Sequence, residues 1–338
     1  MDDNNINEKK EKSEENKNEI KQKVEENVAD NYEKLINYKY NEKGELVNKK
    51  TLKKVEKLDK QEYELVGIYV QHYVENYLIK KFNLKTLYVP NFDINADYYK
   101  RDDTKAQCKI LITKDFPINP KCLMIIQGTG PAKLGQWARS TCINENLKIG
   151  SMASYIENAI KNKFSVIIFN PNERYDFFYE HHKIEEFDSM INHCLYVYAN
   201  IVKKNNNINE IYIVAHSKGG ECAIAILLEF IEDLLYGKIK KIAFTDSAHG
   251  NSYKKLEMEG LKIFRQISRN YVCSKKPAGT FISGYENAKK GVNSYSSGSN
   301  IHENTSGYAV SEIFKFFTSG ENKNKNKSKS TMKFSKRK

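Results

Sequence analysis

The sequence predicts a doubly wound α/β fold, in which helices cover both faces of a mainly parallel sheet. Two observations support this prediction: from residue 122 onward short apolar runs alternate with longer segments of helical periodicity, and the run 122–127 is apolar almost throughout, as in strands buried on both faces. The expected strands are 86–89, 108–113, 122–127, 166–169, 211–215, 241–245 and 270–273, with a further one at 292–296. The expected helices are 55–82, 152–163, 184–203, 219–236 and 311–318.

The helix predictions follow from apolar residues spaced three and four apart. The helix at 55–82 carries such a stripe from Val66 to Leu78 and precedes the alternating pattern, so we expect it to pack on the domain as part of an N-terminal helical and β extension. The helix at 184–203 has its stripe from Phe187 to Val202, which indicates core packing.

The charge distribution separates the two ends of the chain from its middle. Residues 1–30 hold ten acids and six bases with few large apolar groups, so we expect them to be disordered. Residues 321–338 hold seven lysines, one arginine and one glutamate, which contribute +7 of the formal net charge of +12. We therefore predict one domain at 31–320, with a disordered basic tail at 321–338. That tail is typical either of a nuclear-localisation or weak nucleic-acid-binding arm, or of a merely solvated segment.

The sequence indicates neither membrane insertion nor a bound metal. No apolar stretch approaches the roughly 18 to 20 residues of a membrane span, and the first residues do not resemble a secretion signal, so we expect a nuclear or cytoplasmic protein, or one found in both. The six cysteines form no C-x-x-C pair, which argues against a zinc site. Adjacent His181 and His182 lack spaced partners, so we expect no metal there either.

A serine in a glycine-flanked turn is the most informative feature of the sequence. The strand expected at 211–215 leads into Ala215-His216-Ser217-Lys218-Gly219, and an apolar helix follows at once. Small residues two positions before and after the serine allow the sharp turn that exposes a nucleophilic Oγ. We interpret Ser217 as the nucleophile of an α/β-hydrolase-like elbow. The alternative is an ordinary strand-to-helix turn in which the serine or a glycine caps the helix.

An elbow serine needs an acid and a histidine later in the chain. The two downstream histidines are His249 and His302. We predict that His302 is the base, because it lies in a loop rich in serine, glycine and asparagine before the final helix, and we keep His249 as the alternative base. Asp246 is the predicted acid, because it follows the strand 241–245 directly and no carboxylate follows the next strand.

Two backbone N–H groups are needed to stabilise a tetrahedral oxyanion. We expect one from Lys218 and one from the loop Gly128-Thr129-Gly130, where glycine lets the backbone approach a substrate closely. This loop does not continue as a P-loop, so we expect no nucleotide there and no cofactor.

Several segments together resemble the Arb domain, the α/β-hydrolase-like module of argonaute-binding-protein-related proteins and cotranscriptional regulators. In chain order, the matching segments are 41–46, 83–85, 127–130, 135–139, 144–145, 170–173 (Asn-Pro-Asn-Glu), 215–220 (Ala-His-Ser-Lys-Gly-Gly), 245–249 and 302–303. The resemblance covers roughly residues 38–318, and alanine before the elbow agrees with the family's own pattern.

The resemblance implies a nuclear regulator in RNA silencing, heterochromatin or splicing, with an argonaute, chromatin or splicing protein as partner. Beside direct but weak nucleic-acid binding through the basic tail 321–338, it leaves two interpretations open. The first is a serine hydrolase acting on a small ester, thioester or amide through Ser217, Asp246 and His302. The second is a protein-binding scaffold that keeps the fold without the chemistry.

Overall fold

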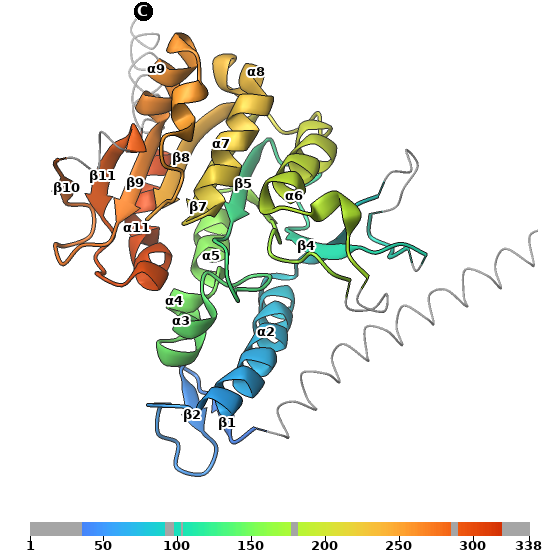
Figure 1. The fold of residues 1–338 in the computed structure, drawn as a ribbon, viewed down its shortest axis with the longest axis vertical. Helices are drawn as coiled ribbons and strands as arrows, with labels where there is room; N and C mark the ends of the chain where they lie inside the picture. The colour runs from blue at the N-terminus through green and yellow to red at the C-terminus, as the bar shows by residue number, and fades with distance from the viewer. Residues whose placement is uncertain (1–35, 92–97, 103, 177–181, 285–289, 320–338) are drawn as a thin grey trace, which may run out of the picture.

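The computed structural model describes residues 36–91, 98–102, 104–176, 182–284 and 290–319 (Figure 1). A nine-stranded sheet runs through the middle of the molecule, and a small two-stranded sheet lies at the far end of helix α2. The small sheet pairs β1 (Tyr38–Tyr40) with β2 (Leu46–Asn48). The strands of the large sheet are β3 (Lys85–Val89), β4 (Cys108–Ile112), β5 (Lys121–Ile126), β6 (Ser165–Ile168), β7 (Glu210–His216), β8 (Ile239–Thr245), β9 (Ser268–Val272), β10 (Phe281–Ile282) and β11 (Asn293–Ser296).

The order of the strands confirms the predicted mainly parallel sheet. Across the sheet it is β10-β11-β9-β8-β7-β5-β6-β4-β3. The six strands from β11 to β6 are parallel, while β10 at one edge and β4 and β3 at the other are antiparallel to their neighbours. Together with the elbow between β7 and the next helix, this arrangement is an α/β-hydrolase-like fold.

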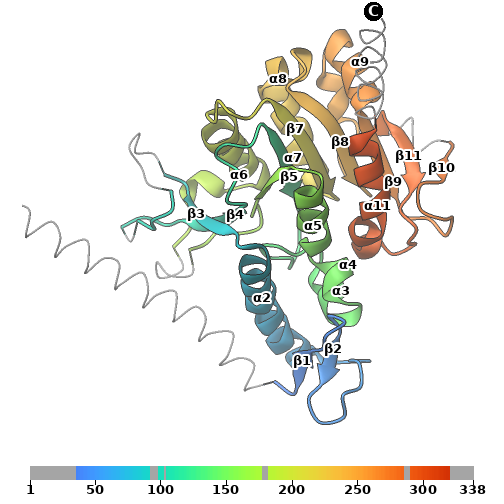
Figure 2. The same ribbon diagram turned by 180° about the vertical axis from the view of Figure 1, so that it is seen from behind.

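Helices cover both faces of the large sheet, as Figures 1 and 2 show from opposite sides. One face carries α6 (Met190–Val197), α7 (Gly219–Glu229), α8 (Ile231–Leu235) and α9 (Met258–Ile267). The other carries α5 (Ala153–Lys161) and α11 (Thr305–Thr318). Below this second face lie α2 (Lys60–Phe82), α3 (Arg139–Asn144) and α4 (Leu147–Gly150).

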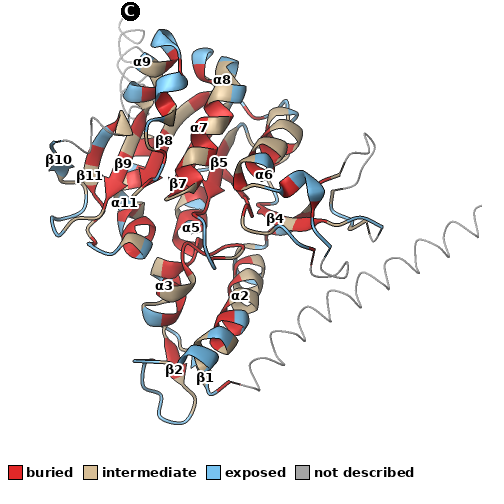
Figure 3. Ribbon diagram, viewed as in Figure 1, coloured by how far each residue is buried: buried red, intermediate tan, exposed pale blue. Residues whose placement is uncertain are grey.

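The central strands bury side chains on both faces, which explains their continuous apolar sequence (Figure 3). Along β5, Met124 and Ile126 belong to the core beneath α6 and α7, whereas Leu123 and Ile125 belong to the core on the α5 and α11 side. This alternation follows from the two-residue period of a strand. The consequence is a rigid central layer whose carboxyl edge positions the site.

Three predicted helices differ from the structure at their ends or in continuity. The helix expected at 55–82 begins at Lys60, because Asp59 caps it by accepting a hydrogen bond from the Glu62 amide. The helix expected at 184–203 is divided into a 3₁₀ turn, α6 and a π-helical segment at 198–203, with Ser189 as the cap of α6. The helix expected at 219–236 breaks at Phe230, whose backbone leaves helical geometry.

Several short elements were not predicted, and the final helix starts earlier than expected. That helix begins at Thr305, directly after the 3₁₀ helix η4 (His302–Asn304), and not at residue 311. Helices α3, α4 and α9 and strands β1, β2 and β10 have no counterpart among the predicted elements. The predicted disordered segment 1–30 and basic tail 321–338 lie outside the described residues. Within the described part of the chain, no helix combines the length and apolar character that crossing a membrane requires.

Candidate active site

Ser217 occupies a strained turn at the carboxyl end of the central strand β7. Its φ is 48°, in the left-handed region that a non-glycine residue adopts at a cost of about 1–2 kcal/mol. Backbone hydrogen bonds hold this conformation: the Ser217 amide donates to the Thr245 carbonyl at 3.1 Å, and the Ser217 carbonyl accepts from the Ala248 amide at 2.8 Å. The strand, the turn and helix α7 therefore form the elbow geometry that the sequence predicts.

Glycine is required at three positions around this turn, because the backbone and neighbouring side chains pack too closely for a Cβ. A Cβ at Gly219 would lie 2.6 Å from the Gln127 carbonyl oxygen. One at Gly220 would lie 1.8 Å from Ser247 Oγ, and one at Gly128 would lie 2.9 Å from Ser217 Cβ. The glycines thus bring the loop after β5, the elbow and the loop after β8 into direct contact.

Asp246 and His302 form a hydrogen-bonded pair beside the elbow. Asp246 follows β8, and its Oδ2 lies 2.6 Å from His302 Nδ1. This hydrogen bond raises the pKa of His302, although partial burial opposes the shift. Partial burial also acts to raise the pKa of Asp246, but hydrogen bonds from His302 and Cys273 outweigh it and hold that pKa below its ordinary value. A carboxylate therefore orients the imidazole and leaves its Nε2 to act on another group.

His249, the alternative base, lies in a different environment. Its Nδ1 is 2.7 Å from Ser247 Oγ and its Nε2 is 2.8 Å from the Lys290 carbonyl, so both ring nitrogens are engaged. Burial lowers the pKa of His249 to about 4, and its ring packs against Phe244. This histidine supports the loop after β8, and it does not line the pocket that contains Ser217.

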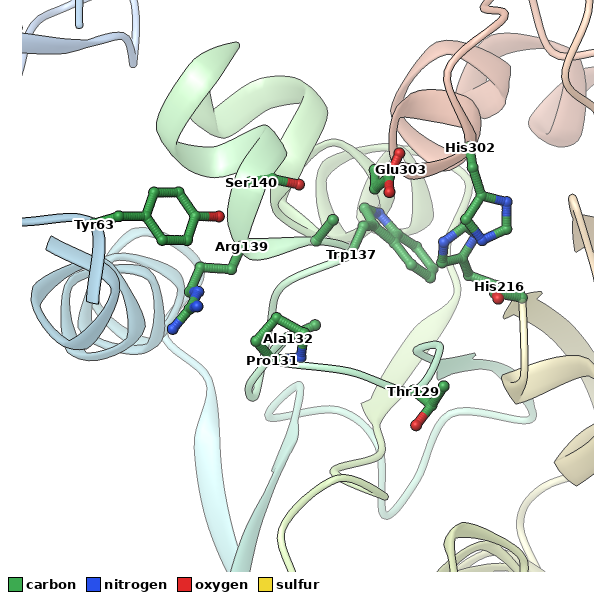
Figure 4. A pocket seen from close by; sticks show the side chains of 12 residues that line it. Tyr63, Thr129, Pro131, Ala132, Trp137, Arg139, Ser140, His216, His302 and Glu303 are labelled. Atoms are coloured by element: carbon green, nitrogen blue, oxygen red, sulfur yellow. The ribbon is translucent and has the colours of Figure 1, made fainter. Parts of the chain in front are cut away.

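A pocket of about 170 Å³ joins Ser217 to His302 (Figure 4). Its wall comes from segments far apart in sequence: the loop after β5, the start of α3, the elbow, the η4 turn and one residue of α2. The lining residues are Tyr63, Thr129, Pro131, Ala132, Trp137, Ala138, Arg139, Ser140, His216, Ser217, His302 and Glu303. The predicted nucleophile and the predicted base therefore face one cavity.

One of the predicted oxyanion residues lines this pocket, and the others adjoin Ser217 or Thr129 in the chain or pack against the elbow. Thr129 lines it, and Gly128 packs against the elbow. Within the described residues, the amides of Lys218 and Thr129 donate to no protein acceptor. Gly130 adopts a φ of 122°, which glycine alone tolerates easily, and has open space around it. The amides of Lys218 and Thr129 therefore stay the predicted donors to a developing negative charge.

Comparison with known proteins identifies the family. The model of the Arb2 domain matches residues 15–278. The chain belongs to the Arb2 domain family. Its curated relatives include a protein named cotranscriptional regulator ARB2A homolog from Dictyostelium discoideum, 31% identical over 79% of this chain and 74% of the relative. Another is cotranscriptional regulator ARB2A from Homo sapiens, 27% identical over 77% of this chain and 71% of the relative.

Solved structures similar to this Arb2 domain include a histone deacetylase from Saccharomyces cerevisiae and an esterase from Pyrobaculum calidifontis. The first has a TM-score of 0.42 and 12% identity, and the similarity covers 75% of this chain and 96% of that chain. The second has a TM-score of 0.32 and 11% identity over 64% and 75% of the two chains.

Sequence reasoning missed two parts of the Arb2 site. Cys273 follows β9 and its Sγ donates to Asp246 Oδ2 at 3.0 Å, so the position after β9 holds a thiol that supports the carboxylate of the neighbouring strand. His216 lies buried beneath the pocket, with its ring centroid 4.8 Å from that of His302 and 6.2 Å from that of Trp137. Burial lowers the pKa of His216 to about 4, so it is a neutral wall of the site at physiological pH. The position of His216 next to Ser217 in the Ala-His-Ser motif could have indicated from sequence that it lies at the site.

The Arb2 pocket is closed on one side by the N-terminal extension. Arg139, at the start of α3, makes two hydrogen bonds of 3.0 Å to the carboxylate of Glu64 on α2, and its guanidinium lies over the Tyr63 ring at 4.9 Å. The extension thereby neutralises the arginine charge at the pocket wall and contributes an aromatic side chain to the lining.

Proposed function

We propose that this Arb2 domain is a serine hydrolase for a short acyl ester, thioester or amide, with Ser217 as nucleophile, His302 as base and Asp246 as the acid that orients His302. The observation that carries the proposal is that a strained elbow serine and a carboxylate-bound histidine share one pocket. A turn that served only to cap a helix would not need a histidine held by a partly buried carboxylate at the same cavity.

The proposed chemistry assigns one step to each of these groups. Ser217 Oγ attacks the acyl carbon while His302 Nε2 takes the hydroxyl proton, and the Lys218 and Thr129 amides stabilise the oxyanion. His302 then gives the proton to the leaving alcohol, thiol or amine. In the second half of the reaction His302 takes a proton from water, the hydroxide attacks the acyl-serine, and His302 returns the proton to Ser217 Oγ as the acid leaves. Within the described residues Ser217 Oγ has no hydrogen-bond partner, which agrees with sites whose serine-to-base contact tightens only when substrate binds.

The size of the pocket limits the acyl group. At about 170 Å³ it is smaller than the roughly 300–1,000 Å³ of cavities that hold drug-sized ligands. Trp137, Pro131 and Ala132 supply an apolar wall, which suits a short acyl chain. The proposal therefore predicts faster turnover of acetyl and propionyl esters than of long-chain esters.

A fluorophosphonate probe tests the proposal directly. Labelling requires an exposed, base-activated serine beside an oxyanion hole, so the full-length protein should be labelled and S217A should not. The variant S311A is the matched control, because Ser311 is exposed on α11 and lies outside the pocket lining. Folded wild-type protein that shows no labelling, or S217A that labels like wild type, would refute the hydrolase.

For the biological setting, we propose a nuclear role in RNA-linked gene regulation with an argonaute, chromatin or splicing protein as partner. The support is membership of the Arb2 domain family, whose curated relatives are named cotranscriptional regulators. The basic segment 321–338, with a local charge of +7, would add nuclear import or weak, salt-sensitive nucleic-acid contact. A tagged chain lacking this segment should accumulate less in nuclei, and an unchanged distribution would remove that role.

A protein-binding scaffold is the second candidate, favoured by curated relatives that are named as regulators and not as enzymes. Under this alternative S217A captures its nuclear partner as well as wild type does, and neither protein reacts with the probe. Labelling of wild type together with loss of labelling in S217A distinguishes the hydrolase from the scaffold.

A further inference from the structure

Three side chains with different metal-binding groups meet beside the elbow. Asp246 follows β8, Cys273 follows β9, and His302 begins η4. Their ligand atoms, one carboxylate oxygen, one sulfur and one imidazole nitrogen, all lie within 4.8 Å of one another. Within this cluster, Asp246 Oδ2 is 2.6 Å from His302 Nδ1 and 3.0 Å from Cys273 Sγ. None of the three is fully buried, so an ion can reach them from solvent.

We propose that Asp246, Cys273 and His302 form a zinc site, and that zinc bound there switches off the serine site. Thiolate, imidazole and carboxylate are the three protein ligand types that zinc accepts, and three protein ligands plus one water complete a tetrahedral site. Ligand atoms about 2.0–2.3 Å from zinc lie roughly 3.2–3.6 Å apart in a tetrahedron. The two short contacts must therefore open by less than about 1 Å, which partly exposed side chains accommodate by small rotations.

The local charge favours a cation. Within the described residues, Asp246 pairs with no lysine or arginine, and its partners are His302 and Cys273. Glu303 lines the same pocket, and its negative charge acts on both Cys273 and His302. A zinc ion would replace the shared hydrogen bonds of the cluster with coordination bonds, and the Cys273 thiol would release its proton to solvent.

The inhibitory consequence rests on the proposed hydrolase function. A neutral imidazole has one N–H and one nitrogen lone pair. If zinc takes the lone pair of His302 Nδ1, the proton must reside on Nε2. The ring then cannot accept the proton of Ser217, and the carboxylate of Asp246 no longer orients the ring for catalysis. The site is therefore either a hydrolase or a zinc complex, but not both at once.

Cadmium binding tests the site without reference to catalysis. Cadmium chloride titrated into the reduced full-length protein should produce a thiolate-to-cadmium charge-transfer absorption with one ion per chain, and zinc chloride should displace it. C273S should lose this absorption, and H302N should weaken cadmium binding by roughly tenfold or more. H182N is the matched control, because His182 is exposed and lies outside the cluster, so it should bind cadmium like wild type. Circular dichroism shows whether C273S and H302N are folded. If one of them is not, the cadmium binding of the other decides.

A second measurement separates the zinc site from the hydrolase. Saturating zinc should slow fluorophosphonate labelling of wild type by at least about tenfold. In C273S, the ratio of the labelling rates without and with zinc should be smaller than in wild type. Absence of the cadmium absorption in folded wild type, or its retention in C273S, would overturn the zinc site. A cadmium absorption that depends on Cys273 in a protein that never labels would keep the zinc site and refute only the hydrolase.

Discussion

Replacing Asp246 with asparagine tests whether its carboxylate prepares His302 for proton transfer. Both His302 Nδ1 and Cys273 Sγ donate to the same oxygen, Oδ2. If the amide places oxygen at that position, the hydrogen bonds remain, but the negative charge that stabilises the imidazolium is gone. If it places nitrogen there, His302 must turn its lone pair toward the amide and carry its proton on Nε2, where it cannot serve as a base.

Either arrangement removes most of the base catalysis. The comparable change in a serine protease triad lowers the rate by about 10⁴, and we expect D246N to slow fluorophosphonate labelling by roughly 10³–10⁴. This loss equals about 4–5.5 kcal/mol of activation free energy at about 1.36 kcal/mol for each factor of ten. The substitution keeps the shape of a partly exposed side chain, so the free energy of unfolding should change much less.

The assay is the initial labelling rate of wild type, D246N and D188N at neutral pH. D188N is the matched carboxylate-to-amide control, because Asp188 is exposed and its carboxylate accepts a hydrogen bond from Asn192 on α6. We expect D188N to stay within about twofold of wild type. A folded D246N that labels within about tenfold of wild type would refute the role of Asp246 in orienting the base.

Three further predictions follow from the packing and titration of the site. G220A should lower the free energy of unfolding, measured in urea, by about 1–2 kcal/mol, because the new Cβ would lie 1.8 Å from Ser247 Oγ. The loss should be smaller when G220A is combined with S247A. An equal loss with Ser247 and with Ala at position 247 would contradict the contact. The labelling rate should fall with pH through a midpoint above 6.5, because the reaction needs neutral His302 and the hydrogen bond to Asp246 raises the pKa of His302. A midpoint below 6.5 would exclude His302 as the base. The free energy of unfolding should fall by at least about 3 kcal/mol between pH 7 and pH 4. Burial lowers the pKa of His193 to about 3 and that of His249 to about 4, so the unfolded state binds more protons as the pH falls below 6.5. An equal free energy of unfolding in urea at pH 7 and pH 4 would contradict this.

The sheet and the elbow were predictable because their determinants are local. Most of the expected strands are short apolar runs, and the structure confirms the mainly parallel sheet that they form. Ser217 stands out because small residues flank it between a strand and a helix. Asp246 and His302 could be proposed because each has a recognisable place in chain order, and their catalytic roles stay predictions.

The features that could not be predicted from the sequence are contacts between strands and loops that become neighbours only in the folded chain. Cys273 contacts Asp246 because β8 and β9 pair in parallel, and nothing local indicates that pairing. Tyr63 reaches the pocket from α2, more than a hundred residues before the elbow in sequence. The break at Phe230 was also hidden, because the apolar pattern continues through it and tertiary packing decides where the helix bends.

Detection of an acyl-enzyme tests the central claim most directly. The full-length protein is mixed with a short p-nitrophenyl ester, quenched in acid during turnover and digested for mass spectrometry. We predict an acyl group on the peptide that contains Ser217, absent in S217A and strongly reduced in H302N, because the base is needed to form it. Acylation at other residues with Ser217 unmodified, or no acylation of the folded wild type by any short ester, would contradict the claim that this Arb2 domain uses Ser217 as a nucleophile.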